Sequence, residues 1–333
     1  MLLIVSEQIE PNVDAVEAIL RERGVAYVRF NTEEFPLAAS LTVGSPTSGT
    51  TGLLKSAGGE VDLSRVRTVW YRRVGPHRLT PGLSVSEERA VRTECDLTLN
   101  SLWSILDCFW VNDPFRQRYA QHKLVQLKVA QRVGFEIPKT LVTNNPDEVL
   151  TFYRECKRQV VFKTFGQSVL KDEEPSDSGQ KPAKVGMIYT NLLRERDFDK
   201  LHTIRACPVL FQEYVPKHVE LRVTIVGREI FAAEIHSQQA PQEATRLDWR
   251  HYDLEHTPHR PHDLPPQVAQ KLLAFMEAFG LAFGCLDLIL TPDGRYVFLE
   301  NNPAGQFGWI EGLVGFPITK SLAEMLIRGR MEP

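Results

Sequence analysis

Two acidic residues and one amide near the C-terminus carry the strongest chemical signal in the sequence. Asp287 and Glu300 each lie inside an apolar, strand-like run, and residues 292–294 between the runs read Pro-Asp-Gly. This tripeptide is typical of a tight turn, because proline fixes φ and glycine accepts a positive φ. The sequence therefore predicts a hairpin in which each strand carries one carboxylate.

The same hairpin is predicted to hold Mg²⁺. Asn302 shares a face with Glu300, because strand side chains repeat every second residue. Carboxylates among apolar neighbours are costly unless a proton or cation compensates them. Three hard oxygen donors suit Mg²⁺, which completes its shell with phosphate and water. A hairpin with solvated acids on its outer face is the alternative, but the apolar neighbours of Asp287 and Glu300 favour the metal site.

A lysine inside a strand-like run indicates a second charged site. Lys163 lies in the apolar run 160–166, where an unpaired ammonium is costly. We therefore expect it to face a cavity that carries negative charge, such as a nucleotide phosphate. The alternative is a side chain that extends along apolar surface and keeps its ammonium in water.

Arginines mark three further positions. Arg72 and Arg73 end a predicted strand, and in open α/β sheets that end faces the ligand crevice, where arginine binds carboxylate or phosphate. Arg222 lies on one face of an alternating strand and is a candidate for phosphate or an acidic peptide side chain. Arg250 could stabilise charge on a transferred phosphoryl group. The alternatives are a surface pair at 72–73 and a structural ion pair between Asp248 and Arg250.

Several of these motifs resemble those of one enzyme family. Asp287 followed by Glu300-x-Asn302 resembles the metal-binding end of ATP-grasp ligases, and this resemblance covers about residues 110–328. Three shorter motifs resemble those of the graspetide (microviridin-type) macrocyclases. They are Tyr71-Arg72-Arg73, Asp248-Trp249-Arg250 and Asn302-Pro303-Ala304-Gly305-Gln306.

The resemblance implies roles for residues that composition leaves unassigned. Lys123 and Lys163 would contact nucleotide phosphates, and Glu220 would contact the ribose. The loop 167–184 would cover the phosphates and exclude water. The hinge beside adenine would be Gln212, Glu213, Tyr214 and Val215, with backbone contacts from Glu213 and Val215.

The resemblance also implies a reaction. With ATP and Mg²⁺, an Asp or Glu side chain of a ribosomal precursor peptide, with a leader and an acidic core, would be phosphorylated. A Ser, Thr or Lys side chain of the same peptide would then close an ester or amide macrocycle, and the enzyme would form a homodimer. The alternatives are an ATP-grasp ligase that adds glutamate or a small amino acid to a protein or metabolite, and a nucleotide-binding module without catalysis.

The composition limits the class of protein and the partners that can be expected. The chain has 333 residues, of which 43% are hydrophobic and 24% charged, and its formal net charge is −3. These values are ordinary for a globular enzyme and give no reason to expect a nucleic-acid or membrane partner. The N-terminus reads as a strand and not as a signal peptide, and the five cysteines are scattered, so we expect a cytoplasmic protein.

The predicted elements place the candidate residues in three parts of an α/β chain with an ATP-grasp fold. Residues 1–114 alternate strand and helix, which predicts a Rossmann-like parallel sheet. Residues 115–215 form a central α+β lid region, and residues 216–333 form a C-terminal antiparallel sheet that carries the metal. Pro216 marks the hinge, since proline cannot continue a strand ladder. The longer helices are predicted at 87–106, 116–133, 145–154, 265–279 and 318–328.

Overall fold

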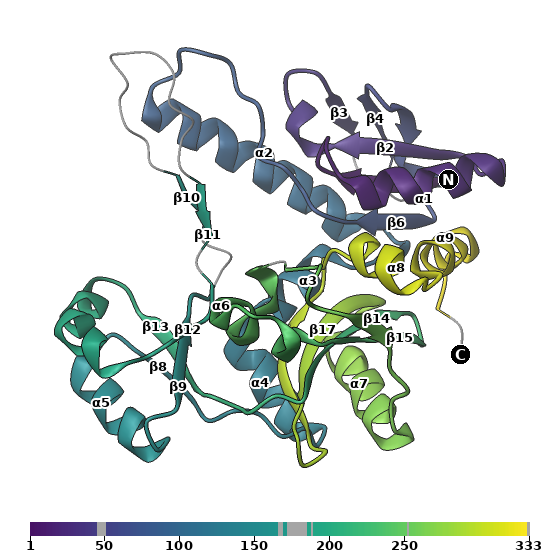
Figure 1. The fold of residues 1–333 in the computed structure, drawn as a ribbon. Coiled ribbons are helices and arrows are strands. Elements are labelled where there is room, and N and C mark those ends of the chain that lie inside the picture. Colours follow the sequence, from purple (N-terminus) through teal and green to yellow (C-terminus); the bar gives the residue numbers. More distant parts are fainter. Residues whose placement is uncertain (45–50, 166–168, 172–184, 188, 252, 332–333) are drawn as a thin grey trace.

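The computed structural model describes residues 1–44, 51–165, 169–171, 185–187, 189–251 and 253–331. Figure 1 shows the N-terminal sheet above the C-terminal sheet, with the central sheet at the lower left. This mixed α/β architecture, with a parallel N-terminal sheet and antiparallel sheets elsewhere, confirms the predicted fold class.

The N-terminal sheet is parallel, with strand order β2-β1-β6-β7. Its strand β1 is buried along its whole length, because helices pack on one face of the sheet and a helix and a second sheet pack on the other. An antiparallel three-stranded sheet, β3-β4-β5, lies beside it. The elements are β1 (Leu2–Ser6), α1 (Pro11–Glu22), β2 (Tyr27–Asn31), β3 (Ser40–Val43), β4 (Gly52–Ser56), β5 (Gly59–Asp62), β6 (Thr68–Tyr71), α2 (Val85–Ile105) and β7 (Phe109–Val111).

The central sheet is antiparallel, with strand order β12-β9-β13-β8. A separate two-stranded ribbon, β10-β11, stands away from it in Figure 1. Asn145 caps α5 by accepting from the N–H of Asp147 at 3.2 Å, as its position before a proline predicts. The elements are β8 (Thr140–Thr143), α5 (Pro146–Glu155), β9 (Val160–Lys163), β10 (Val169–Lys171), β11 (Val185–Met187), β12 (Asn191–Leu192), a 3₁₀ segment (Glu195–Ala206) and β13 (Val209–Glu213).

The C-terminal sheet is antiparallel, with strand order β16-β15-β14-β17-β18. Helices α4 and α7 pack against it through a cluster of buried Leu, Phe and Val side chains. The elements are α3 (Pro114–Ala120), α4 (Lys123–Arg132), β14 (Val219–Val226), β15 (Glu229–Ile235), α6 (Glu243–Leu247), β16 (His259–Pro261), α7 (Pro266–Phe279), β17 (Phe283–Leu290), β18 (Tyr296–Asn302), α8 (Gly308–Val314) and α9 (Ile318–Arg328).

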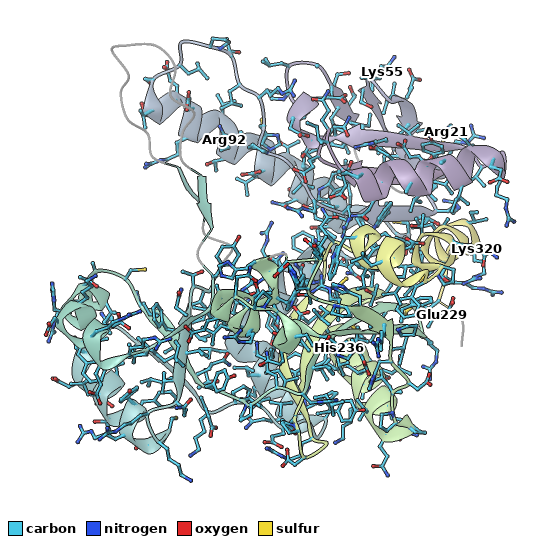
Figure 2. All side chains as sticks on the ribbon, viewed as in Figure 1. Arg21, Lys55, Arg92, Glu229, His236 and Lys320 are labelled. Atoms are coloured by element: carbon cyan, nitrogen blue, oxygen red, sulfur yellow. The ribbon has the colours of Figure 1, made fainter. Side chains whose placement is uncertain are left out.

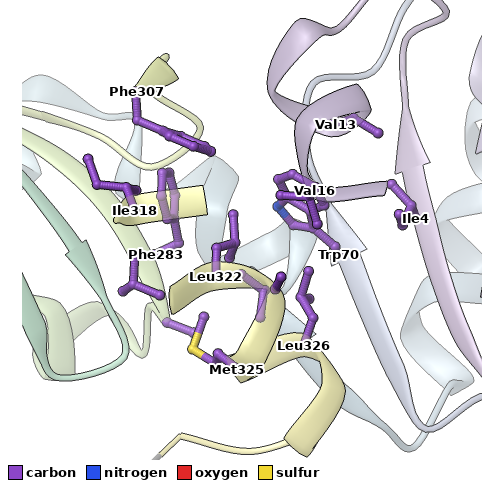
Figure 3. Packing of buried hydrophobic residues seen from close by; sticks show 14 of the residues in the cluster. Ile4, Val13, Val16, Trp70, Phe283, Phe307, Ile318, Leu322, Met325 and Leu326 are labelled. Atoms are coloured by element: carbon purple, nitrogen blue, oxygen red, sulfur yellow. The ribbon is translucent and has the colours of Figure 1, made fainter. Parts of the chain in front are cut away.

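One hydrophobic core joins the two ends of the chain. Figure 3 shows Val16 of α1 and Trp70 of β6 facing Leu322 and Leu326 of α9, with Phe283 nearby. All of these side chains are almost fully buried. The N-terminal sheet therefore packs directly against the part of the chain that carries the predicted metal hairpin.

Charged side chains lie on the outside of this arrangement. In Figure 2, Arg21 of α1, Lys55 of β4 and Lys320 of α9 project from the surface, and all three residues are exposed. Within the described residues, none of the helices combines the length and apolar character that a bilayer crossing requires.

The structure corrects two predicted elements. The single helix predicted at 116–133 is two helices, α3 and α4, which are interrupted at Gln121 and His122. Most of the predicted loop 167–184 lies outside the described residues, which include only β10 from it. The strand expected at 187–190 is also replaced, since β11 pairs with β10 whereas β12 pairs with β9.

Candidate nucleotide and metal site

The predicted hairpin is present and brings the two acids together. In the antiparallel pair β17–β18, Asp287 lies directly opposite Glu300, and Asn302 lies opposite Cys285. Gly294 has a φ of 84°, the positive value that its place in the turn predicts. Side chains directly opposite on one sheet face have Cβ atoms about 5 Å apart, so both carboxylates share one small volume.

Each acid is held by a basic side chain. Arg222 lies opposite Asp287 on β14, and its Nη1 donates to both carboxylate oxygens at 3.0 Å. The Nζ of Lys123, at the start of α4, forms an ion pair with Oε2 of Glu300. Oδ1 of Asn302 accepts from the N–H of Ala304 at 3.1 Å.

The two acids differ in their protonation behaviour. Burial raises the pKa of Asp287, with Arg222 opposing this change and Glu300 adding to it. Burial also disfavours ionised Glu300, but Lys123 and the other nearby cations outweigh it and hold the pKa of Glu300 well below its usual range. Burial lowers the pKa of Lys163 to about 8.

Arg250 reaches the same volume from another segment. Its Nε and Nη2 donate to the two carboxylate oxygens of Asp248 at 2.8 and 2.5 Å. Although burial opposes ionisation, these hydrogen bonds lower the pKa of Asp248 to about 2. Asp248 also accepts from the N–H of Thr190 at 3.0 Å, which ties this segment to the central sheet. The structural ion pair considered for this motif is present, and Arg250 still lines the cavities described next.

A first cavity runs between the central and C-terminal sheets. Its lining includes the predicted hinge, Lys163 and Glu220, together with both acids of the hairpin. The side chain of Gln212 is occupied, since its Nε2 donates to Thr140 Oγ1 at 3.0 Å. The N–H groups of Glu213 and Tyr214 donate to backbone carbonyls at 2.9 Å, so the predicted adenine contacts depend on the Glu213 carbonyl and the Val215 N–H.

Glu220, the predicted ribose contact, is buried among protein partners. Lys217 Nζ donates to one of its oxygens at 2.7 Å, and Ser237 Oγ donates to the other at 2.5 Å. Burial raises the pKa of Glu220, and Lys217 opposes that change. The sequence reasoning missed Lys217, which lines the first cavity and also donates to the carbonyls of Arg246 and Leu247. A lone lysine after a proline gives no signal of such a role.

A second, larger cavity of about 850 Å³ lies beside the end of β18 and the residues that follow it. It shares Lys163, Arg250 and Glu300 with the first cavity, so the two meet at the predicted metal site. Its other lining residues include Lys123, Asn302 and the Arg72-Arg73 pair. The side chain of Arg73 is 41% exposed, whereas that of Arg72 is 1% exposed.

The charges at this meeting point fit an anionic nucleotide and a divalent cation. Four basic side chains, Lys123, Lys163, Arg222 and Arg250, lie around three acids, Asp248, Asp287 and Glu300. A partly buried excess of positive charge requires an anion. The facing carboxylates of Asp287 and Glu300 also fit a metal ion, because hard divalent cations such as Mg²⁺ prefer oxygen ligands. In this structure a protein cation neutralises each carboxylate.

A second missed residue holds the end of β18. Gln126 of α4 accepts from the N–H of Asn301 at 2.9 Å and donates to its carbonyl at 2.8 Å. These bonds fix the backbone between Glu300 and Asn302. A glutamine in an amphipathic helix gives no sign in the sequence that its amide serves a strand 175 residues away.

Comparisons with known proteins agree with this geometry. Residues 1–118 match the family model described as the MvdD pre-ATP grasp domain. The macrocyclase MdnC from Microcystis aeruginosa, solved with the precursor peptide MdnA, is 32% identical, with 98% of this chain and 99% of that chain covered and a TM-score of 0.84. A RiPP-associated ATP-grasp ligase from Chryseobacterium gregarium, solved with ADP and with leader and core peptides, is 30% identical, with 98% and 96% covered and a TM-score of 0.87.

The macrocyclase MdnB from Microcystis aeruginosa is 29% identical, with 98% of this chain and 99% of that chain covered and a TM-score of 0.78. No curated protein sequence matches the chain. Identity of 30% or more over nearly the whole length, together with the shared fold, establishes the relationship. The chain belongs to the family of RiPP-associated ATP-grasp ligases that contains the macrocyclase MdnC.

Proposed function

We propose that this chain uses ATP to close ester or amide macrocycles in a ribosomal precursor peptide. The observation that carries the proposal is the meeting of two cavities at one group of charges. A cleft lined by the predicted hinge and a basic cavity of about 850 Å³ share Lys163, Arg250 and Glu300. Relatives solved with a precursor peptide, or with ADP and leader and core peptides, support a nucleotide in one cavity and an acidic peptide in the other.

The proposed reaction has two balanced steps. An Asp or Glu carboxylate oxygen of the peptide attacks the γ-phosphorus of ATP, the bond to the bridging oxygen breaks, and ADP leaves an acyl phosphate behind. A Ser or Thr hydroxyl, or a Lys amine, then attacks the acyl carbon and expels phosphate, which takes up the proton. In phosphoryl transfer, most of the catalysis is positioning and charge stabilisation.

The nucleotide contacts follow the lining of the first cavity. We assign the Glu213 carbonyl and the Val215 N–H to adenine and Glu220 to the ribose. Lys123 and Lys163 are assigned to the phosphates. Each lysine is partly buried beside Glu300, so each ammonium is near the acid that the metal would share.

Magnesium would be held by Asp287, Glu300 and Asn302, where it would neutralise phosphate charge. Arg222 is bonded to both oxygens of Asp287, so we assign it to holding this metal ligand in place. We assign Arg250 to the charge that develops on the transferred phosphoryl group. The exposed Arg73 is the better candidate for a peptide carboxylate, because Arg72 is buried.

The test is ADP release with and without precursor-like peptides that contain Glu with Thr, or Glu with Lys. The proposal predicts peptide-stimulated ADP release and a product lighter than the peptide by one water per ring. An amino-acid ligase would instead give a product heavier by one residue. Stimulation by no peptide, or a heavier product, would contradict the proposal. The predicted homodimer is tested separately by measuring the mass of the protein in solution.

A further inference from the structure

A buried polar junction joins the N-terminal sheet to the loop after the metal hairpin. Its centre is Gln306, whose Nε2 donates to Glu10 Oε2 at 3.1 Å. Oε1 of Gln306 accepts from Arg72 Nη2 at 3.3 Å and from Asn12 Nδ2. Arg72 Nη2 also lies 3.8 Å from Glu10 Oε1. Two motifs far apart in the sequence, at 71–73 and 302–306, therefore meet in one contact.

Arg72 is a core residue of this junction. Its guanidinium carbon lies 5.7 Å from the ring centre of Phe283 and 5.6 Å from that of Phe307, and Figure 3 shows these two rings side by side. Among the described residues, neither Nε nor Nη1 of Arg72 has a hydrogen-bond partner. The two aromatic rings instead compensate the charge by cation–π contacts. Burial lowers the pKa of Arg72 to about 10, so it stays charged at neutral pH.

The same residue, Gln306, reaches the predicted metal site through its backbone. Its carbonyl accepts from Arg222 Nη2 at 3.1 Å, while Nη1 of the same guanidinium holds both oxygens of Asp287. Trp309 Nε1 donates to that carbonyl as well, at 3.2 Å. The orientation of Arg222 is therefore set on one side by Asp287 and on the other by the carbonyl of Gln306.

The loop that carries this carbonyl is packed without spare room. A Cβ atom on Gly305 would lie 2.5 Å from Cβ of Cys285 and 2.9 Å from Nη2 of Arg222. Neither approach is tolerable, so glycine is needed for the loop to lie this close to β17. A small movement of the loop would move the Gln306 carbonyl away from Arg222.

We infer that Arg72 and Gln306 are positioning residues for the metal site. Through Glu10 and Asn12 they anchor the loop 303–307 to the N-terminal sheet, and the Gln306 carbonyl then fixes Arg222 and, through it, Asp287. The inference rests on the proposed metal role of Asp287. It assigns Arg72 to the support of the metal site, and it leaves Arg73 as the arginine of this pair that can meet a peptide.

The test compares Mn²⁺ binding to the full-length protein with ADP present, measured by electron paramagnetic resonance, in wild type and in Gln306→Met. Methionine has the same length as glutamine and removes only the polar contacts of the side chain. Residues that orient metal ligands typically change metal affinity by 10- to 100-fold, so we expect about tenfold weaker Mn²⁺ binding. The affinity for ADP without metal should change less than about twofold.

An arginine outside the junction supplies the control. Arg72→Met should weaken Mn²⁺ binding as Gln306→Met does, Arg72→Lys should recover part of the loss, and Arg21→Met, at an exposed arginine of α1, should leave Mn²⁺ affinity unchanged. Wild-type Mn²⁺ affinity in Gln306→Met would overturn the inference, as would a Gln306→Met protein that fails to fold, since the junction would then be purely structural.

No peptide is present in this experiment, so its outcome is independent of macrocycle formation. A wild-type protein that binds ADP but no Mn²⁺ would contradict the proposed metal site itself. A protein whose Mn²⁺ affinity depends on Gln306, but which acts on no peptide, would contradict the proposed reaction and leave the positioning role in place.

Discussion

Two buried polar clusters lie on either side of the loop 303–307, and they differ in their charge balance. At the junction, two acids, Glu7 and Glu10, lie beside two bases, Arg72 and Arg73, and the amides of Asn12 and Gln306 donate to the Glu10 carboxylate. At the hairpin, four bases lie around three acids beside two cavities. A balanced cluster needs no ligand, whereas an excess of buried charge requires one. Charge balance therefore separates the structural cluster from the binding site.

The largest expected effect is the loss of turnover when a metal ligand in the binding site is replaced. Asp287→Asn removes one of the two facing carboxylates but keeps an oxygen for Arg222. Loss of charge stabilisation by the metal is worth several kcal/mol, so turnover should fall by roughly three orders of magnitude. Peptide-stimulated ADP release measures this, with circular dichroism as the control for folding. ADP release at the wild-type rate would refute the metal role of Asp287.

The next largest effect is a loss of stability when the buried ion pair of the junction is removed. Glu10 is fully buried, and Glu10→Ala leaves the Arg72 charge without a carboxylate. Removing one partner of a buried pair typically lowers the free energy of unfolding by about 3 kcal/mol or more. Urea denaturation measures the change. Glu7→Ala is the control, since the Glu7 side chain is 32% exposed and its ion pair with Arg73 is partly solvated, so its loss should cost less than about 1 kcal/mol. Equal losses from both variants would contradict the assignment of Glu10 and Arg72 to one buried pair.

A smaller effect concerns nucleotide affinity and its dependence on pH at the binding site. Lys163→Met should weaken nucleotide binding by about 2 kcal/mol, or roughly 30-fold, the value of a hydrogen bond to a charged group. Because the pKa of Lys163 is about 8, the ammonium is present below that pH and is lost above it. Wild-type affinity for ADP should therefore fall as the pH rises from about 7 to about 9, while the variant stays flat over this range.

The control for this variant is stability without nucleotide. Because Lys163 adds to an excess of positive charge, its removal should not lower the free energy of unfolding. A parallel fall of ADP affinity with pH in wild type and variant would show that another group titrates. Lys128→Met, an exposed lysine on the same helix as Lys123, should leave nucleotide binding unchanged at every pH.

The smallest effect concerns the peptide side. Arg73 is half-exposed at the wall of the larger cavity, where an ion pair is worth about 1 kcal/mol or less. Arg73→Met should therefore raise the KM for peptide by at most about fivefold and leave the KM for ATP unchanged. Steady-state kinetics with varied peptide and fixed ATP measure this. An increase in the KM for ATP alone would place Arg73 on the nucleotide side.

The sequence predicts local features of this molecule well. The turn at 292–294 and the apolar runs around it predict the hairpin, because turn chemistry and strand alternation are local. They do not predict the register shift next to Asp287, which brings Asp287 opposite Glu300 instead of Leu299. The helix at 318–328 is also predicted with its observed bounds. The break between α3 and α4 is missed, because Gln121 and His122 are compatible with a helix. The bond from Gln126 Nε2 to the Ala120 carbonyl, which spans the break, cannot be recognised from a helical pattern.

Contacts across the chain are beyond local reasoning. Strand alternation puts Arg72 and Arg73 on opposite faces, but only the packing of Phe283 and Phe307 shows which of the two is buried. The contact between Arg72 and Gln306 joins residues 234 positions apart. The partners of Arg222 likewise depend on how β14 and β17 pair, which no single segment determines.

The most direct test of the central claim is diffraction from crystals soaked with Mn²⁺ and a non-hydrolysable ATP analogue. We expect an anomalous peak for manganese between the carboxylates of Asp287 and Glu300, with the γ-phosphate beside Lys163 and Arg250. A nucleotide bound elsewhere, or a manganese peak away from both carboxylates, would contradict it.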